Sequence, residues 1–260
     1  KIAKKQIRQK YFERPFYDEI KILSEKYLKL HCFRLLIKEN KNSELILDQI
    51  NSDQKILLQI ILKLVVLQIP NSPIDSHIKH IINKSDSDLP YILEFFDTSF
   101  EKNIRNILMP IIDPDINFSK KDIKKIQKKN SIDLIMKSWS ESKHKWKSVI
   151  AIDYVLKYDK SIIEKINWDK VHPSIYLAEI FNKKLDSNPL IPVNKFKTQS
   201  EKTMFTILEK TLLLKSVDLF ENIPGELLSK ISQISSAKNY DKDEFIFNEG
   251  DSGDSLFIVL

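Results

Sequence analysis

The sequence predicts a mainly α-helical protein: an α-solenoid of short helical hairpins, followed by the start of a β-domain. Three observations lead to this prediction. Residues 1–224 contain no glycine, and their apolar residues recur at helical spacing. Helix pairs follow one another at intervals of about 40 residues, which is typical of stacked helical repeats. After the last predicted helix, apolar runs alternate with polar residues around two glycines, which indicates strands.

The helices of the solenoid are expected between Pro, Asn, Asp and Ser residues that interrupt the apolar pattern. Pro70 should end the second helix, because proline supplies no helical N–H. Ser99 is the expected N-cap of the fifth helix, and Pro110 and Pro114 should close that hairpin. In chain order the expected helices are Phe16–Glu39, Asp53–Ile69, Ile74–Asn83, Leu89–Phe96, Ser99–Met109, Lys120–Lys129, Ile132–Trp139, Lys145–Tyr158, Ser161–Ile166 and Ser174–Asn182.

A proline-containing segment then separates the solenoid from the rest. Asn188–Thr198 reads as a loop, and Ser200–Lys215 reads as a connecting helix with Met204 in its apolar stripe. Pro224 suits the first turn of a further helix running to about Ser236. The apolar residues expected to form the inner face of that helix are Leu227, Leu228, Ile231 and Ile234. Two strands, Glu244–Asn248 and Ser255–Leu260, should flank the loop between them.

These patterns divide the chain into a repeat region (1–186), a linker (187–199), a connecting helix (200–216) and the start of a β-domain (217–260). The first residue, Lys1, and the last, Leu260, which lies inside an apolar run, lead us to expect a piece of a longer protein.

Composition excludes several classes of protein. Apolar residues make up 42% and charged residues 30% of the chain, which fits a folded protein. The net charge of +6 is spread as alternating Lys and Asp or Glu, so a nucleic-acid partner is not expected. The single cysteine, Cys32, excludes a disulfide framework and is expected to be buried. The most apolar window, Ile56–Ile69, is too short to span a bilayer.

The Gly-Asp loop near the C-terminus raises the question of a site. Ser252 lies in a Gly-Asp-Ser-Gly sequence, but a nucleophilic serine needs a base and oxyanion donors that the helical chain before it does not offer. Glu249 and its acidic neighbours lack the ligand spacing of an EF-hand, so a metal is not expected. The loop therefore reads as a structural turn made by Gly250, Asp251, Gly253 and Asp254.

The remaining candidates also read as structural. His77 and His80 lack further ligands for zinc, and His31, His144 and His172 are isolated. Trp139 and Trp146 lie among lysines, as in a base-stacking platform, but core positions in a helix pair explain them better. No glycine is available for a phosphate-binding loop before Gly225. No catalytic constellation emerges, so an enzyme is not expected.

The C-terminal segment resembles the start of a cyclic nucleotide-binding domain. The resemblance rests on Lys215–Phe220, Ile223–Leu228 and Ile246–Phe257, which match the turn, the short helix and the Ile-Phe-x-Glu-Gly-Asp-x-Gly-Asp-Ser-Leu strand of that family. It implies a β-jelly-roll that binds cyclic AMP or cyclic GMP. The residues that hold the ligand's phosphate in that family would lie beyond Leu260, so no ligand-binding residue and no cofactor is assigned within this chain.

The preceding region is similar to HEAT-like repeats of bacterial proteins that join a nucleotide-translocase-like membrane domain to a cyclic nucleotide-binding domain. Leu93–Asp97, Leu108–Asp113 and Met204–Phe220 carry this similarity. It implies a regulatory, signal-responsive chain in the cytoplasm, or at the cytoplasmic face of the inner membrane if a translocase-like domain precedes it, with a protein partner on the repeats. The alternatives are the cytosolic tail of a membrane nucleotide transporter of the ATP/ADP type and a scaffold that binds no nucleotide.

Overall fold

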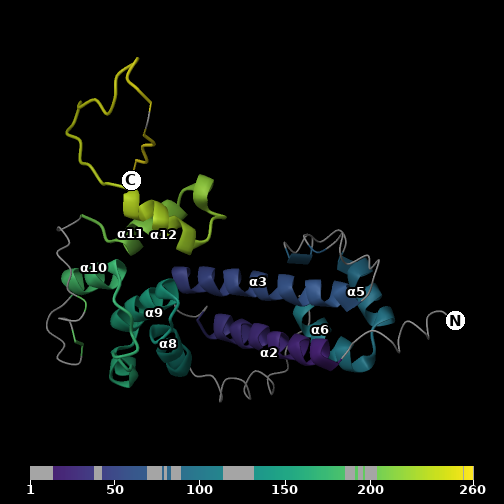
Figure 1. Ribbon diagram of the computed structural model, residues 1–260. Helices are drawn as coiled ribbons and strands as arrows, with labels where there is room; N and C mark the ends of the chain where they lie inside the picture. Colours follow the sequence, from purple (N-terminus) through teal and green to yellow (C-terminus); the bar gives the residue numbers. More distant parts are fainter. Residues whose placement is uncertain are drawn as a thin grey trace. The chain divides into compact units, whose positions relative to one another are not determined.

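The computed structural model describes residues 14–37, 43–68, 78, 81–82, 89–113, 132–184, 191–192, 196, 204–253 and 255–259. All regular secondary structure in these ranges is helical, which confirms the predicted mainly α-helical class (Figure 1). The chain divides into two compact units, residues 1–138 (unit 1) and residues 139–260 (unit 2). Within the described ranges, none of the helices combines the length and apolarity that crossing a bilayer requires.

Unit 1 is built on two long helices, α2 (Arg14–Ile37) and α3 (Glu44–Gln68), which pack side by side (Figure 1). Both were predicted, although α3 begins nine residues before the expected Asp53. The Ser43 hydroxyl, at the start of α3, donates a hydrogen bond of 3.4 Å to the carbonyl of Ile37, so the end of α2 and the start of α3 are joined. Cys32 is buried between apolar neighbours, as predicted.

A helical hairpin, α5 (Leu89–Ser99) and α6 (Lys102–Ile112), completes unit 1. Arg105 ties the hairpin together, because its Nη1 atom lies 3.0 Å from both the carboxylate and the carbonyl oxygen of Asp97. The prediction that Ser99 is the N-cap of this second helix was wrong. This residue ends α5, and Glu101 stands at the N-cap of α6. Pro110 was expected to close the hairpin but lies inside α6, near enough to its end to remove one backbone hydrogen bond only.

The core of unit 1 collects side chains from α2, α3, α5 and α6 and from Ile78 and Ile81. Phe96 and Phe100 stack with ring centroids 5.1 Å apart, and Phe95 meets both rings edge-on. Such aromatic pairs stabilise by about 1 kcal/mol beyond the area they bury. The buried residues of this core are Ile20, Leu23, Tyr27, Leu58, Ile61, Leu62, Val65, Ile78, Ile81, Ile92, Phe96, Phe100, Ile104, Leu108, Ile111 and Ile112.

The end of α8 (Ile132–Ser140) leads into unit 2, where α9 (Lys145–Tyr158), the 3-10 helix η1 (Lys160–Lys165) and α10 (Ile175–Lys184) form its first part. His144 caps α9 by accepting the N–H of Lys147, and Asp159 caps η1 by accepting the N–H of Ser161. The tryptophans of the lysine-rich stretch, Trp139 and Trp146, are 9% and 3% exposed, which confirms their predicted core positions.

The second part of unit 2 contains α11 (Ile207–Lys215), the 3-10 helix η3 (Asp218–Phe220) and α12 (Gly225–Ile234). The predicted helix Ser200–Lys215 therefore starts too early, and Met204 lies before α11 with 48% of its surface exposed. The reason is a capping box, in which the Thr206 hydroxyl accepts the N–H of Glu209 and the Glu209 carboxylate accepts the N–H of Thr206. This motif fixes the first turn of α11.

The inner face of α12 matches the expected one only in part, since Leu228 is buried as predicted. Leu227 and Ile234 of the predicted inner face are 49% and 87% exposed, whereas Ser229 and Ser232 are 1% and 0% exposed. Helix α11 packs against this serine-lined side, and the hydroxyls of Thr211 and Ser232 lie 3.0 Å apart. Small side chains on the inner face let the two helices approach closely, while Leu227 and Ile234 are left outside.

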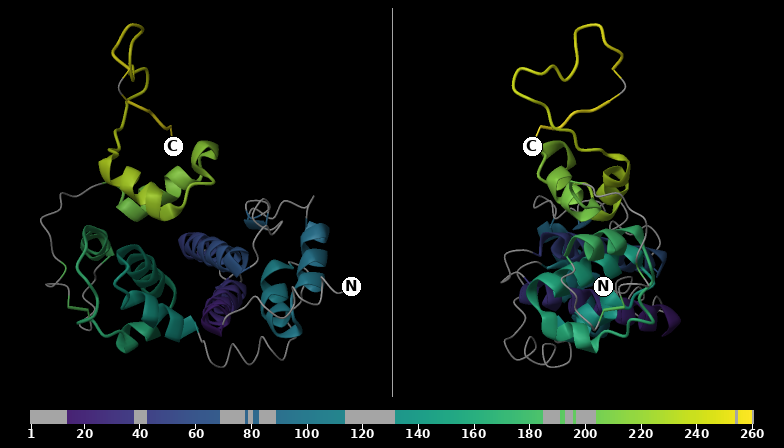
Figure 2. Two further views of the ribbon diagram at one scale, coloured as in Figure 1. Left: turned by 45° about the vertical axis from the view of Figure 1, so that its right-hand side comes forward. Right: turned by 90° about the vertical axis from the view of Figure 1, so that its left-hand side faces the viewer.

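The segment after α12 is irregular where the structure describes it. Residues 235–253 and 255–259 contain no strand, so the predicted strands Glu244–Asn248 and Ser255–Leu260 are not formed there (Figure 2). The rings of Phe247 and Phe257 nevertheless lie 5.8 Å apart, which brings the two segments together. An isolated pair of strands is marginally stable in water without a third strand or a packing partner. The β-jelly-roll stays a prediction.

Candidate functional site at the junction of α10, α11 and α12

The predicted structural turn is an exposed loop. Gly250 adopts φ +94°, in the left-handed region that favours glycine. Asp251 closes the turn, because its carboxylate accepts the N–H of Asn248 at 2.7 Å and its own N–H donates to the Asn248 carbonyl at 3.1 Å. No atom lies within 4 Å of the position where a Cβ on Gly250 or Gly253 would stand, so neither glycine is required by a close neighbour. Asp254 lies outside the described residues.

The other candidates are dispersed. Ser252 is exposed, and so is Glu249. His77 and His80 lie outside the described residues. His31 shares a contact of 3.5 Å with Arg34 of its own helix. In the part of the chain that the structure describes, no group of three or more His, Cys, Asp or Glu side chains is placed to hold a metal ion.

A set of polar contacts, by contrast, joins α10 to the start of α11. The carboxylate of Glu179 accepts the N–H of Ile207, the first residue of α11, at 2.8 Å. Burial raises the pKa of the Glu179 carboxyl, while the Ile207 N–H and the nearby Lys210 ammonium lower it and Glu209 raises it. An acidic group at a helix N-terminus also compensates the positive end of the helix dipole. Glu179 thus ties the start of α11 to α10.

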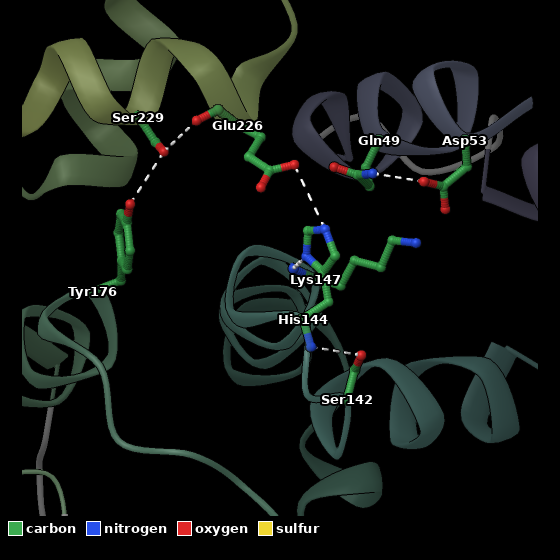
Figure 3. Close-up of polar contacts among 8 residues, drawn as sticks. All are labelled: Gln49, Asp53, Ser142, His144, Lys147, Tyr176, Glu226 and Ser229. Carbon is green, nitrogen blue, oxygen red and sulfur yellow. Dashed lines mark hydrogen bonds and ion pairs between the residues drawn. The ribbon is translucent and has the colours of Figure 1, made fainter. Parts of the chain in front are cut away.

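A second contact joins α10 to α12 (Figure 3). The Tyr176 hydroxyl lies 3.2 Å from the Ser229 hydroxyl and accepts a hydrogen bond of 2.6 Å from the Gln233 side chain. Ser229 also donates to the carbonyl of Glu226 at 2.7 Å, which directs its hydroxyl hydrogen back to α12. With that hydrogen engaged, Ser229 accepts from the Tyr176 hydroxyl. The Tyr176 ring meets Trp146 of α9 edge-on at 6.1 Å, so the hydroxyl is held by a buried anchor.

A third contact joins α9 to α12. His144 Nε2 lies 3.6 Å from the Glu226 carboxylate, and Figure 3 shows the ring directed from the N-cap of α9 toward the first turn of α12. The Nδ1 atom of the same ring accepts the N–H of Lys147 at 3.5 Å. One neutral tautomer, with its hydrogen on Nε2, suits both neighbours. Both side chains are about two-fifths exposed, so this contact contributes less than a buried pair.

Helices α11 and α12 are themselves bound firmly to each other. The ammonium group of Lys210 donates to the carbonyl of Ser235 at 2.7 Å, just after the last residue of α12. That of Lys215 donates to the carbonyls of Glu221 and Ile223 at 2.8 and 2.9 Å, in the turns before α12. Two lysines of α11 therefore satisfy carbonyls at both ends of α12. We call α11, η3 and α12 together the junction pair.

These contacts can hold α11 and α12 in place against α9 and α10 and can couple a movement of one pair of helices to the other. In the part of the chain that the structure describes, three side chains join the junction pair to α9 and α10 by polar contacts: Glu179, Tyr176 and His144. Sequence reasoning missed all three residues, since each contact spans 28 or more positions of the chain and leaves no local pattern. The capping box of α11 had a visible signal, Thr206 with Glu209 three residues later, which we did not use.

No protein-family model matches this chain. No solved structure matches it significantly. Its function is therefore argued from its own residues.

Proposed function

We propose that this chain is a regulatory, non-enzymatic protein in which stacked HEAT-like helical repeats precede a cyclic nucleotide-binding domain. The junction pair transmits the state of that domain to the repeats. The proposal joins the resemblance of Lys215–Phe220 and Ile246–Phe257 to the cyclic nucleotide-binding family with the bonding of the junction. The cyclic nucleotide, AMP or GMP, would be held by residues of the complete domain that the resemblance implies.

The observation that carries the proposal is the outward apolar side of the junction pair. Leu219, Leu227 and Ile234 are 70%, 49% and 87% exposed, although the opposite side of α12 is buried at Leu228, Ser229 and Ser232. Exposed apolar groups of this size favour a covering partner. The resemblance implies a β-domain at this point of the chain, and such a domain would bury them. The apolar side chains that follow in the C-terminal segment, Phe245 and Phe247 among them, would supply its core.

Coupling requires that the ligand bind two conformations with different affinity. The bonding of the junction supports two such conformations. The junction pair is held together by lysine–carbonyl bonds and by Thr211 and Ser232, so it would move as one piece. Its described polar links to α9 and α10 come from three side chains. The hydrogen bonds of Glu179 and Tyr176 contribute about 1 kcal/mol each, and the more exposed His144–Glu226 contact contributes less. A ligand with a differential affinity of a few kcal/mol would therefore suffice to break or remake them.

Isothermal titration of the intact protein with cyclic AMP and with cyclic GMP tests the proposal. We expect heat of binding and a raised melting temperature for one of them. We also expect that hydrogen exchange at the amides of α11 changes with ligand, and that Tyr176→Phe changes the size of that response. Tyr158→Phe, an exposed tyrosine on α9, is the matched control. Absence of both heat and thermal shift would sink the sensor function.

Two other functions would then be left. A scaffold that binds no nucleotide predicts a stable helical protein with unchanged hydrogen exchange under all ligands. A cytosolic tail of a membrane nucleotide carrier predicts a series of apolar spans encoded upstream of Lys1. The reading frame upstream of the present sequence decides between these two.

A further inference from the structure

Helix α3 is apolar on two opposite sides in its second half. Leu58, Ile61, Leu62 and Val65 are 5% exposed or less and face the core of unit 1. Ile56, Ile60 and Leu67 are 55%, 41% and 69% exposed. At 100° per residue, these three and the exposed Lys63 fall in a strip about 60° wide on the side away from the core. We call Ile56, Ile60, Lys63 and Leu67 the outer stripe.

A helix that is apolar all round is normally covered all round. No described residue of unit 1 covers the outer stripe, although α3 is well packed on its inner side. Its four side chains are spaced at i, i+4, i+7 and i+11. Side chains at this spacing lie on one face of a helix and are typical of helix–helix contacts. Along the helix axis the stripe extends for about 16 Å, or three turns. Its shape therefore matches a helix of similar length.

We propose that the outer stripe docks an amphipathic helix of another protein, with an apolar stripe and acidic residues beside it. The charge of the surface selects this partner. Lys63 lies within the stripe and is exposed, Lys55 is exposed one residue before the stripe begins, and α3 carries no Asp or Glu after Asp53. Carboxylates that flank an apolar stripe would meet these ammonium groups, and such complementary charges set the orientation and the partner of paired helices.

The same charges disfavour the other occupants. Two copies of α3 paired through their outer stripes would bring Lys63 of each copy into one seam with no carboxylate of the stripe between them, and like charges across an interface oppose association. A lipid surface would require a broad apolar face, as in helices that lie in a membrane interface. Here the exposed apolar strip is narrow and has Lys63 near its middle, which favours a helix seam.

The test uses the full chain and two synthetic helical peptides of about 20 residues, long enough to fold partly in water. Both peptides carry leucines at i, i+4, i+7 and i+11. One has glutamates beside the leucines and the other has lysines. Fluorescence anisotropy measures binding of each peptide to the wild type and to Ile60→Gln, Lys63→Glu and Ile22→Gln. Ile22, on α2, is 47% exposed and lies outside the stripe, so it is the matched control.

We expect the acidic peptide to bind saturably and the basic peptide to bind at least about tenfold more weakly, the usual effect of losing a central interface contact. Ile60→Gln should lower the affinity for the acidic peptide by about tenfold, and Ile22→Gln should leave that affinity unchanged. Lys63→Glu should reverse the preference between the peptides. Since all three substitutions are at exposed positions, slow reaction of the buried Cys32 thiol confirms that each variant is folded.

Other outcomes overturn the proposal. If the acidic peptide binds wild type and Ile60→Gln with equal affinity, the outer stripe is not its binding site. Absence of saturable binding would also contradict the proposal. Sedimentation that reveals a dimer dissociated by Ile60→Gln would assign the surface to a second copy. Binding to phosphatidylglycerol vesicles that Ile60→Gln abolishes would assign it to a membrane.

Discussion

The carboxylate of Glu179 on α10 accepts the backbone N–H of Ile207, the first residue of α11, at a distance of 2.8 Å. This bond is made in addition to the capping box of Thr206 and Glu209, so the N-terminus of α11 is bonded both by its own residues and by the preceding helix. The position of α11 is therefore tied to α10, and Glu179 is the residue through which the two helices can be uncoupled without disturbing either one.

The pH dependence of stability should change when Glu179 is replaced by Gln. Burial raises the pKa of the Glu179 carboxyl, so the folded state binds this proton more tightly than the unfolded state does. The corresponding stability is fully present below the ordinary carboxyl pKa and is lost as the pH rises through the raised pKa. Glu179→Gln keeps an oxygen for the Ile207 N–H but cannot ionise. Its stability relative to the wild type should therefore increase as the pH rises from below the ordinary carboxyl pKa through the raised one.

Urea unfolding followed by tryptophan fluorescence measures this effect, because Trp139, Trp146 and Trp168 all lie in unit 2 and are the only tryptophans of the chain. Glu164→Gln removes the same charge from an exposed position on η1 and is the control. If both variants show the same change with pH relative to wild type, the effect of Glu179 is one of net charge alone. Glu179→Ala cannot ionise either, so it should follow the same pH trend as Glu179→Gln but lie about 1 kcal/mol lower in stability, because Ile207 then loses its acceptor.

Tyr176→Phe should loosen the junction pair with little change in packing. The substitution removes one hydroxyl, which contacts Ser229 at 3.2 Å and Gln233 at 2.6 Å, and leaves the ring on Trp146. We expect a loss of about 1 kcal/mol in the unfolding free energy of unit 2. A double-mutant cycle with Gln233→Ala should give a coupling energy of about 0.5 kcal/mol or more. Additive effects of the two substitutions would contradict a direct bond.

The Cys32 thiol should report on unit 1 alone. It is the only cysteine of the chain, it is 2% exposed, and burial raises its pKa above the ordinary thiol value. Because the thiolate is the reactive form, both effects slow its reaction with a disulfide reagent. We expect labelling in native buffer to be several orders of magnitude slower than in urea, as it must follow opening of α2 from α3. Rapid labelling of the native protein would contradict the packing of these helices.

Sequence patterns predicted helices where local signals are strong. The range Lys145–Tyr158 was correct at both ends, since the polar His144 and Asp159 flank an uninterrupted helical stretch. The sequence patterns did not predict features that depend on packing between residues distant in sequence. Glu179 and Tyr176 contact α11 and α12, which lie far from them in the sequence. No local sequence pattern around either residue indicates these contacts. Pro110 was read as a helix end because propensity alone takes no account of the packing of Ile111 and Ile112 in the core.

On α12, the inner face predicted from hydrophobic periodicity differs in part from the face that is buried in the structure. Hydrophobic periodicity assigned Ile234 to the inside, but it is 87% exposed while Ser232 is fully buried beside Thr211. Ser232→Ile should therefore overpack the contact with α11 and destabilise unit 2 by about 1–3 kcal/mol. Ile234→Ser should change stability by less than about 0.5 kcal/mol, as is usual at exposed positions.

The measurement is again urea unfolding by tryptophan fluorescence, with Ser232→Ala as the control that removes the hydroxyl without adding volume. If helix periodicity were the better guide, Ile234→Ser would cost the larger free energy and Ser232→Ile would be neutral. In a longer protein that carries the complete β-domain, Ile234→Ser should become destabilising, because the proposed function covers that side chain. The difference between the two chains would then measure how much of the outward face of α12 the β-domain buries.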